Sequence, residues 1–325
     1  MNTLNRKKVL VIGGAGLIGS HVVEQLLLED VAEVVIYDNF VRGTKENIGK
    51  ALKDPRCTVY PIGGDIRDID ILNSAMKDKD YVVHLAALWL LQCYEYPRAA
   101  FETNIKGTYN VLEACRDNNI KKLVYSSSAS VYGNAIEIPM TEDHPFNNDT
   151  FYGATKIAGE QMLHAFHKRY GLNYSGLRYM NVYGPRQDYK GAYIAVIMKM
   201  LDKIDKGEQP EIYGDGSQTY DFIYVEDIAR ANVCALKSEY ESGFYNVGMG
   251  KGTTIKELAE MIVKVTGFEK GVKYNPQGKT FVTQRIGSTE KAEKELDFKA
   301  KVELEEGLKK LIEWRNAHKE KTQKG

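Results

Sequence analysis

Short apolar segments rich in β-branched residues alternate with amphipathic segments along the first half of the chain. The apolar segments have the length of buried strands and cover residues 7–12, 33–37, 57–61, 81–86, 122–126 and 173–177. Between them, residues 18–28 and 105–117 have the spacing of amphipathic helices. Strands that alternate with helices in this way predict an α/β fold with a Rossmann-type, doubly wound parallel sheet.

After about residue 180 the pattern loosens, and Gly, Pro and Tyr become frequent at 183–185 and 213–216. Short apolar segments mix there with helical patterns at residues 192–206, 226–238, 255–266 and 303–318. We therefore expect a first domain over residues 1–179 and a smaller, mixed α/β lobe over residues 180–325. Some segments of this lobe are expected to pack back on the first domain.

Composition excludes several classes of function. The 325 residues carry 44 Lys plus Arg and 44 Asp plus Glu, without the basic excess that a nucleic-acid partner requires. Near the start, the apolar runs are too short for a membrane span or a signal-peptide core, so we expect no membrane partner. The cysteines at positions 57, 93, 115 and 234 have no metal-binding spacing. They indicate a reducing, cytoplasmic location and no metal site.

A glycine-rich turn follows the first predicted strand, in the segment Gly13-Gly-Ala-Gly16-Leu-Ile-Gly19. Gly13 and Gly16 allow the backbone to turn tightly and to approach a pyrophosphate at the helix N-terminus. Gly19 allows that helix to pack closely on the sheet. The G-x-x-G-x-x-G spacing is a variant of the dinucleotide-binding pattern, although a simple tight turn between strand and helix would also use these glycines.

An acidic residue at the end of the second predicted strand favours the dinucleotide. Asp38 lies about twenty residues past the turn, where a carboxylate accepts hydrogen bonds from the adenine ribose hydroxyls. A carboxylate at this place repels a 2′-phosphate, so we predict NAD as the cofactor. Arg42 and Lys45 nearby keep NADP as the alternative.

A serine, a tyrosine and a lysine are the candidate catalytic residues. Tyr152 and Lys156 lie one turn apart on a predicted helix, and Ser128 follows a strand at the carboxyl edge of the sheet. Oxidation of a secondary alcohol requires a base for the hydroxyl proton, and a neighbouring ammonium favours the phenolate of a tyrosine. The alternative is a polar helix N-terminus with Tyr152 packed on the sheet.

These features together resemble the extended short-chain dehydrogenase/reductase family, within the NAD-dependent epimerases and dehydratases, and in particular its nucleotide-sugar epimerases of the UDP-glucose (UDP-galactose) 4-epimerase type. The resemblance covers nearly the whole chain, from about Lys8 to about Trp314. It rests on the glycine turn, Asp38-Asn-Phe, Gly64-Asp65-Ile66, His84-Leu-Ala-Ala87, the segment 104–114, Ser126-Ser-Ser128-Ala-Ser-Val-Tyr-Gly133, Tyr152-Gly-Ala-Thr-Lys156, the segment 177–186, and Tyr220-Asp-Phe-Ile-Tyr-Val-Glu-Asp227.

The resemblance implies a role for each matching position. The cofactor-binding residues would be Gly13, Gly16, Leu17, Ile18, Asp38, Asn39, Asp65, Ile66, Leu85, Ala86, Ala87, Asn104, Ser126, Tyr152, Lys156 and Tyr179. The catalytic residues would be Ser128, Tyr152 and Lys156, and the substrate-binding residues would be Ser128, Tyr152, Asn181, Arg186 and Tyr213. From periodicity alone, Ala86, Ala87 and Asn104 are core or capping residues, and His84 is interpreted as a core histidine.

Other members of the family differ at the residues after Ser128. The 4,6-dehydratases carry Thr-Asp-Glu where this chain has Ser128-Ala129-Ser130, and the decarboxylases keep the glutamate. Neither Ala129 nor Ser130 can move a proton in that way, so both activities are disfavoured. The family arginine that contacts the substrate diphosphate is replaced by Tyr220, and a second one, upstream of Lys291-Ala292, is missing. Arg186, Lys279 or Arg285 could compensate.

We therefore predict a nucleotide-sugar epimerase that inverts the 4-hydroxyl through a transient keto-sugar with tightly bound NAD. Two alternatives remain: a nucleotide-sugar ketoreductase or another NAD(P)-dependent nucleotide-sugar enzyme of this fold, and a catalytically silent NAD-binding protein. The sugar, the nucleotide and the pathway stay open. The resemblance also implies a homodimer, in which the helices at 99–117 and 151–170 pair across a two-fold axis.

Overall fold

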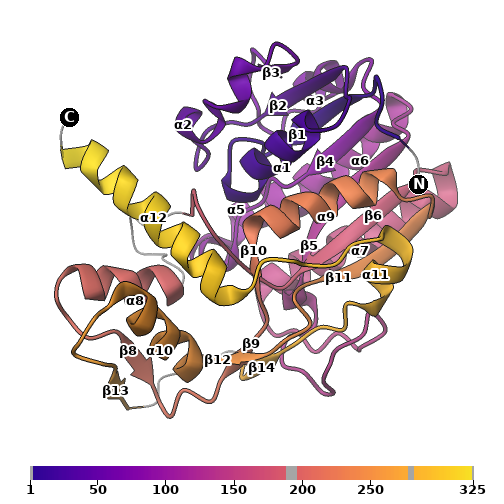
Figure 1. Ribbon diagram of the computed structural model, residues 1–325. Helices are drawn as coiled ribbons and strands as arrows, with labels where there is room; N and C mark the ends of the chain where they lie inside the picture. The colour runs from indigo at the N-terminus through magenta and orange to yellow at the C-terminus, as the bar shows by residue number, and fades with distance from the viewer. Residues whose placement is uncertain (1–2, 188–195, 277–281, 324–325) are drawn as a thin grey trace.

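The computed structural model of the chain describes residues 3–187, 196–276 and 282–323. Within these ranges, seven parallel strands form one sheet in the order β11-β6-β5-β4-β1-β2-β3 (Figure 1). They are β1 (Lys8–Ile12), β2 (Glu33–Tyr37), β3 (Cys57–Val59), β4 (Tyr81–His84), β5 (Lys122–Ser128), β6 (Tyr174–Tyr179) and β11 (Ser242–Val247). The predicted Rossmann-type sheet is confirmed, and its strand order reverses between β1 and β4.

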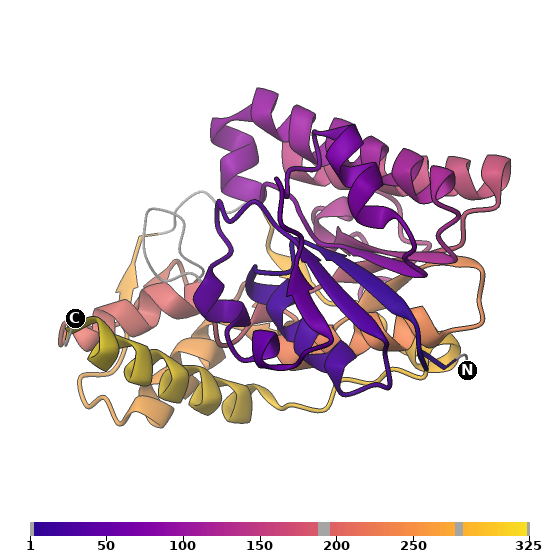
Figure 2. The same ribbon diagram turned by 90° about the horizontal axis from the view of Figure 1, so that it is seen from above.

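Both faces of the sheet are buried, which explains why its strands are almost continuously apolar. In β1, Val9 and Val11 belong to one hydrophobic core, whereas Leu10 and Ile12 belong to the other. This division follows from the alternation of side chains along a strand. Helices α1 (Leu17–Leu27) and α9 (Val225–Lys237) cover the first face, and α3 (Ile69–Met76), α6 (Thr108–Asp117) and α7 (Phe151–Tyr170) cover the second (Figure 2).

Several element ends differ from the prediction. The strand expected at 81–86 ends at His84. The Leu85 N–H donates a last hydrogen bond to the Ile12 carbonyl (2.9 Å), and the chain leaves the sheet after it. Strands β5 and β6 run further than expected because they pair with each other up to Ser128 and Tyr179. The first half also contains α2 (Lys45–Ile48), η1 (Ala51–Lys53), α4 (Leu90–Glu95), α5 (Pro97–Ala100), the π-helix η2 (Phe101–Gly107) and η3 (Ala129–Val131).

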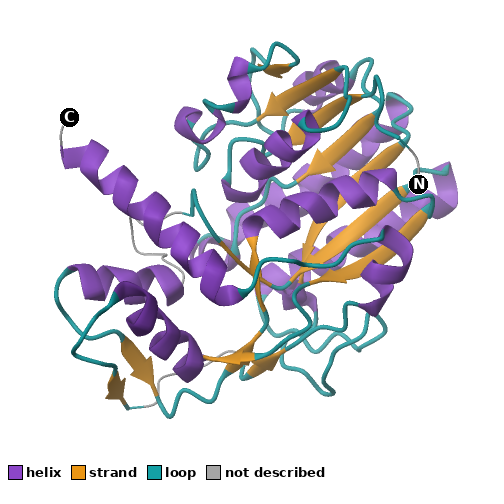
Figure 3. Ribbon diagram, in the orientation of Figure 1, coloured by secondary structure: helices purple, strands orange, loops and turns teal. Residues whose placement is uncertain are grey.

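The second half forms a smaller lobe with its own hydrophobic core (Figure 3). Its elements are β7 (Asn181–Tyr183), α8 (Val196–Asp205), β8 (Glu211–Tyr213), β9 (Thr219–Tyr220), β10 (Phe222–Tyr224), β12 (Thr253–Thr254), α10 (Ile255–Thr266), β13 (Lys273–Asn275), β14 (Gln284–Arg285) and α12 (Leu304–Gln323). Helix α11 (Glu290–Leu296) packs instead on α9 and on the sheet strand β11. The α10 prediction is confirmed residue for residue, since Thr254 and Glu257 cap its start and Gly267 ends it in the left-handed region (φ 66°). Of the helix predicted at 192–206, residues 192–195 lie outside the described residues.

The two halves of the chain interlock. Strand β11 pairs with β6 and forms an edge of the sheet, and α9 packs on α1, so both belong to the first lobe in space (Figure 1). The domain boundary at residues 179 and 180 stays a prediction. In the described part of the chain, no helix combines the length and the apolar character that a membrane crossing requires.

Candidate active site

The glycine turn joins β1 to α1 at the carboxyl edge of the sheet. Gly13 has φ +79°, and a Cβ there would lie 2.8 Å from the backbone nitrogen of Ala86. A Cβ on Gly19 would lie 2.1 Å from the Gly13 carbonyl oxygen. Helix α1 starts after Gly16 with no side-chain cap and no acidic residue in its first turn. Its N–H groups and positive dipole end are therefore suited to an anion such as a pyrophosphate.

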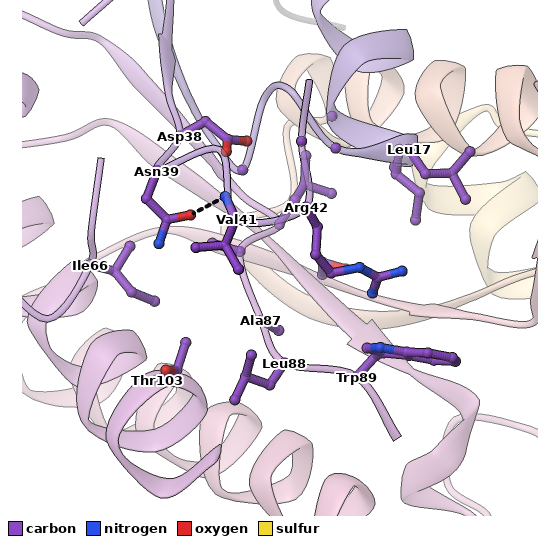
Figure 4. Close-up of a pocket in the computed structure, with 18 of the residues that line it drawn as sticks. Leu17, Asp38, Asn39, Val41, Arg42, Ile66, Ala87, Leu88, Trp89 and Thr103 are labelled. Carbon is purple, nitrogen blue, oxygen red and sulfur yellow. Dashed lines mark hydrogen bonds between the residues drawn. The ribbon is translucent and has the colours of Figure 1, made fainter. Parts of the chain in front are cut away.

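Asp38 follows β2 and is held in place by the backbone. Its carboxylate oxygens accept hydrogen bonds from the N–H groups of Ala15 and Phe40, both at 2.8 Å. Burial raises the pKa of this carboxyl, and the two N–H donors offset the rise in part. The Arg42 guanidinium lies over the Trp89 ring, 4.9 Å from its centroid, on another side of the cavity from Asp38 (Figure 4).

A cavity of about 560 Å³, here called the cofactor cavity, opens between these turns. It is lined by the predicted residues Gly13, Gly16, Leu17, Ile18, Asp38, Asn39, Asp65, Ile66, Leu85, Ala86, Ala87, Ser126, Ser128, Tyr152, Lys156 and Tyr179. The glycine turn, the uncapped helix start and the carboxylate of Asp38 suit a dinucleotide with a free 2′-hydroxyl.

Asn104 lies behind the cofactor cavity and does not line it. Its side chain is buried, accepts a hydrogen bond from the Leu88 N–H (2.7 Å) and donates to the Leu88 carbonyl (2.8 Å) and to Thr155 Oγ1 (3.2 Å). Asn104 therefore fixes the loop that follows β4 against helix α7. In this way Asn104 supports a loop that lines the cavity, but its own side chain does not line the cavity.

Arg186 lies on the cofactor side of the site, which differs from the substrate-binding place that the resemblance implies. It lines the cofactor cavity and forms an ion pair with Glu24 of α1. The chain turns sharply after β7, with Gly184 at φ 151° and Arg186 at φ 70°, and this turn directs the guanidinium toward the carboxylate on α1. A substrate contact for Arg186 stays a prediction.

Helix α7 places Tyr152 and Lys156. Thr150 caps the helix by accepting a hydrogen bond from the Gly153 N–H (3.0 Å), so Tyr152 lies in the first turn and Lys156 one turn later. Lys156 is buried and its ammonium donates to the Ser126 carbonyl (2.6 Å), 5.7 Å from the centroid of the Tyr152 ring. Helix α7 and strand β5 therefore bring the three candidate catalytic residues together.

Burial dominates the titration of this group. It raises the pKa of Tyr152 to about 12, although a hydrogen bond with Ser128 and the charge of Arg285 act in the opposite direction. It lowers the pKa of Lys156 to about 8. Desolvation outweighs the groups that lower the tyrosine pKa, and these are Ser128 and Arg285 rather than the ammonium of Lys156 that we expected. Ser128 Oγ accepts a hydrogen bond from the Ser130 N–H (3.1 Å), which leaves its own proton available to a partner.

A buried ion pair next to the site was not predicted from the sequence. Arg178 on β6 pairs with Glu160 on α7 at 2.7 Å, and both side chains are almost fully buried. Glu160 also accepts a hydrogen bond from Ser127 Oγ (2.6 Å), between Ser126 and Ser128 on β5. The pair thus links the strands and the helix that carry the candidate catalytic residues. A charged residue inside an apolar strand, as at Arg178, was the available signal.

A second cavity of about 620 Å³ lies beside the first and is walled by both lobes. Neighbouring residues of the chain line different cavities: Tyr152 and Met180 line the cofactor cavity, whereas Thr150 and Asn181 line the second cavity. The two cavities therefore meet at the start of α7. Of the predicted substrate residues, Asn181 and Tyr213 lie in the second cavity.

A glycine turn at a helix start, a buried acid after β2 and a Ser-Tyr-Lys group lie together at one sheet edge, as the resemblance implies for an enzyme that transfers hydride to or from an alcohol. The chain belongs to the NAD dependent epimerase/dehydratase family, whose sequence model matches residues 9–248. Its cofactor is NAD. The sequence-based identification of the family is confirmed.

Named relatives cover almost the whole chain. A putative UDP-glucose 4-epimerase of Methanocaldococcus jannaschii is 38% identical over 309 residues, which are 94% of this chain and 97% of the relative. The UDP-N-acetylglucosamine 4-epimerase of Methanobrevibacter ruminantium, solved with UDP-N-acetylmuramic acid, has a TM-score of 0.90 at 37% identity and covers 98% of this chain and 100% of its own. The NAD complex of Thermus thermophilus UDP-glucose 4-epimerase has a TM-score of 0.84 at 33% identity, covering 95% and 99% of the two chains.

Proposed function

We propose that the protein is a nucleotide-sugar 4-epimerase, which oxidises the 4-hydroxyl of a sugar and reduces the resulting ketone from the opposite face. One observation carries the proposal: Ser128, Tyr152 and Lys156 lie where the cofactor cavity meets a second cavity of about 620 Å³. A hydroxyl of a molecule in the second cavity can thus reach both the tyrosine and the cofactor. The relatives are named as UDP-sugar 4-epimerases, which supports the same reaction.

The residues around the cofactor cavity divide the binding of NAD between them. The turn at Gly13 and the start of α1 would hold the pyrophosphate, and Asp38 would accept hydrogen bonds from the adenine ribose. Lys156 lies near enough to the catalytic tyrosine to reach the other ribose as well. When bound, NAD supplies reversible hydride acceptance, so no net oxidation of the sugar is required.

Tyr152 is the proposed base. Its phenol oxygen takes the proton of the 4-hydroxyl as that alcohol is oxidised, and returns it when the ketone is reduced. Lys156 favours the phenolate by its positive charge, and Ser128 holds the substrate oxygen and the tyrosine oxygen in one place. Because burial raises the pKa of Tyr152 to about 12, the phenolate fraction increases with pH, whereas the Lys156 ammonium, with a pKa of about 8, is lost above that pH. We therefore expect turnover to increase with pH up to about 8 and to stop increasing above it.

Elimination of water from the sugar is not part of the proposal. Ala129 and Ser130, which follow the catalytic serine, are both buried in η3, and neither side chain can act as an acid at neutral pH. The site therefore has a base at the 4-hydroxyl but no proton donor of the kind that a dehydratase uses next to it.

The test is a panel of nucleotide sugars incubated with the purified protein and followed by NMR. We expect one or more of them to be converted to the 4-epimer without added reductant and without release of a ketone. Net consumption of NADPH with a reduced product would instead identify a ketoreductase. Absence of any turnover, together with tight NAD binding, would leave a silent NAD-binding protein as the better description.

We also propose that the protein is a homodimer. The helices at 99–117 and 151–170 expose large aromatic side chains to solvent, among them Phe101, Tyr109, Phe151 and Tyr170. Burial of such side chains against a second copy is favourable. Light scattering at micromolar protein should give twice the mass of the chain, and Tyr109→Glu should lower it. Tyr274→Glu, at an exposed tyrosine of β13, is the matched control, and a monomer mass for the unmodified protein would disprove the dimer.

A further inference from the structure

The second cavity contains a guanidinium that forms no ion pair within the described part of the chain, although Asp149 and Glu211 line the same cavity. Among the described residues that line it, Arg285 on β14 is the one with a positive charge. Its guanidinium donates one long hydrogen bond, from Nη2 to the Gly133 carbonyl at 3.5 Å, and its buried Nε has no partner in the described part of the chain. Burying a charge is costly unless the charge is paired, so this arrangement is suited to an anion that arrives with a ligand.

The neighbours of Arg285 do not supply that anion. Tyr220 is its register partner on β9, but the Tyr220 hydroxyl donates to the Val282 carbonyl at 2.6 Å. Glu211, a carboxylate of the same cavity, is engaged by Lys273 at 3.4 Å and Lys203 at 3.7 Å. Desolvation lowers the pKa of Arg285, with opposing effects from Tyr220, Tyr152 and Asp149. Asp149 lines the same cavity and its charge acts on Arg285, but it forms no ion pair or hydrogen bond with the guanidinium in the described part of the chain.

Arg285 lies near the catalytic group and also belongs to the small sheet of the second lobe. On one side it reaches the Gly133 carbonyl, shortly after the strand that ends in Ser128, and its charge acts on Tyr152. On the other side it pairs with Tyr220 in the small sheet of the second lobe. A nucleotide sugar that reacts at Tyr152 has its sugar at the catalytic group, so its diphosphate follows directly behind the sugar.

We propose that Arg285 is a substrate-binding residue that holds the diphosphate of the nucleotide sugar, an inference that rests on the proposed function. The planar guanidinium offers parallel N–H donors that match phosphate oxygens. The other candidate cations are placed differently: Arg186 is paired with Glu24 on the cofactor side, and Lys279 lies outside the described residues.

The test measures nucleoside diphosphate binding, which does not depend on turnover. Calorimetric titration with UDP, and in parallel with dTDP, compares the unmodified protein with Arg285→Met. We expect the better of the two nucleotides to bind on the order of 10- to 100-fold more weakly to the variant, as for the loss of charge-assisted hydrogen bonds, while NAD affinity is unchanged. Arg6→Met is the matched control, because Arg6 is exposed before β1, at the opposite edge of the sheet.

Two further variants keep the test decisive. Arg285→Lys retains the charge but loses the fork of donors, so it should weaken UDP binding less than Arg285→Met does. It also serves as the test if the methionine variant does not fold. Adding Tyr220→Arg to Arg285→Met places a guanidinium on β9, opposite position 285, and should recover part of the lost UDP affinity. If the double variant bound UDP as weakly as Arg285→Met alone, that result would count against a diphosphate site on this pair of strands.

Unchanged UDP affinity in Arg285→Met would overturn the inference, as would failure of the unmodified protein to bind either nucleotide. If Arg285→Met bound UDP-glucuronate more weakly but bound UDP as well as the unmodified protein does, Arg285 would bind a carboxylate on the sugar, and the inference would also be overturned. Equal weakening of UDP and NAD would indicate a structural role. Weakened UDP binding in a protein that epimerises no sugar would uphold the inference and refute the proposed function.

Discussion

The cofactor cavity and the second cavity meet at the start of α7 but are lined by different kinds of structure. Where β1 meets α1, the first is formed by backbone: a glycine turn after β1, an uncapped helix start and the loop after β4, all at one edge of one sheet. The second is formed by side chains from several short elements of both lobes, including β8, β9 and β14. Backbone geometry allows little variation, whereas side chains can be exchanged one at a time. The structure therefore keeps one cofactor while leaving the choice of substrate adjustable.

The largest effect is expected at Tyr152, which joins the two cavities. Tyr152→Phe keeps the ring but removes the oxygen that takes the proton, so turnover should fall by about 10²- to 10⁴-fold while NAD still binds. Epimer formation by NMR and NAD binding by calorimetry measure the two quantities. Near-normal turnover of this variant would mean that the proposed chemistry is wrong.

Two further variants allow the loss of turnover in Tyr152→Phe to be compared with losses at the other two candidate catalytic residues. Ser128→Ala should be milder, because a water molecule can partly replace a hydroxyl that only positions the substrate. Lys156→Met should slow turnover by raising the tyrosine pKa, and should also weaken NAD binding if the ammonium reaches the ribose. A Ser128→Ala variant slower than Tyr152→Phe would reverse the proposed roles.

The next largest effect tests the backbone-built cavity. Gly13→Ala places a left-handed alanine at φ +79° and a Cβ 2.8 Å from the Ala86 nitrogen, so we expect NAD affinity to fall by more than about tenfold. Gly171→Ala is the control, because Gly171 has φ +71° but nothing within 4 Å of an added Cβ. Both variants should lower the melting temperature, but only Gly13→Ala should affect NAD. Equal NAD affinity in both would contradict a cavity formed by the backbone.

A smaller effect is expected at Asp38. Asp38→Ala removes the carboxylate that repels a 2′-phosphate, so the preference for NAD over NADP should narrow by roughly tenfold. Titration of each dinucleotide gives the ratio. Asp65→Ala is the matched variant, because Asp65 lines the same cavity but is expected beside the adenine, and it should weaken both dinucleotides alike. Tighter binding of NADP than of NAD by the unmodified protein would refute the assignment.

The last prediction concerns how stability depends on pH, and the two regions should respond in opposite directions. Burial lowers the pKa of His84, below the cofactor cavity, to about 3, so its contribution to stability is present above about pH 6.5 and is lost as the pH falls. Burial raises the pKa of Asp221, beside the second cavity, to about 7, so its contribution is present below about pH 4 and is lost as the pH rises. Each change has a slope of at most about 1.4 kcal/mol per pH unit.

Urea unfolding between pH 4 and 7 measures both contributions. The free energy of unfolding of the unmodified protein, minus that of His84→Gln, should increase with pH, whereas the difference from Asp221→Asn should decrease with pH. Two differences of the same sign would show that burial does not control these two groups.

The cofactor side could be predicted from the sequence because its determinants are local. A strand, a glycine turn and a helix follow one another along the chain, and the distance from Gly13 to Asp38 reflects one βαβ unit. Tyr152 and Lys156 are recognisable because a helix fixes their relative positions. Each of these signals needs only the geometry of a single element or of two neighbouring ones.

The second cavity could not be predicted in the same way, because contacts distant in sequence determine it. Arg285 was one of three candidate cations, and the structure separates it from Arg186 because Arg285 pairs with Tyr220 across β14 and β9, whereas Arg186 pairs with Glu24 of α1. The ion pair of Arg178 with Glu160 likewise needs the packing of β6 against α7. The sequence pattern identifies such residues as unusual but does not indicate their partners.

The position of β11 also affects how the polypeptide is made. During synthesis, β6 is complete once residue 179 has left the ribosome, but its neighbour β11 extends to Val247. In that interval the nascent chain presents an unpaired strand edge, and the face of α1 that later receives α9 is uncovered. Such edges and faces promote association between incomplete chains. A truncated gene product that ends near residue 180 should therefore aggregate rather than persist as a free NAD-binding module.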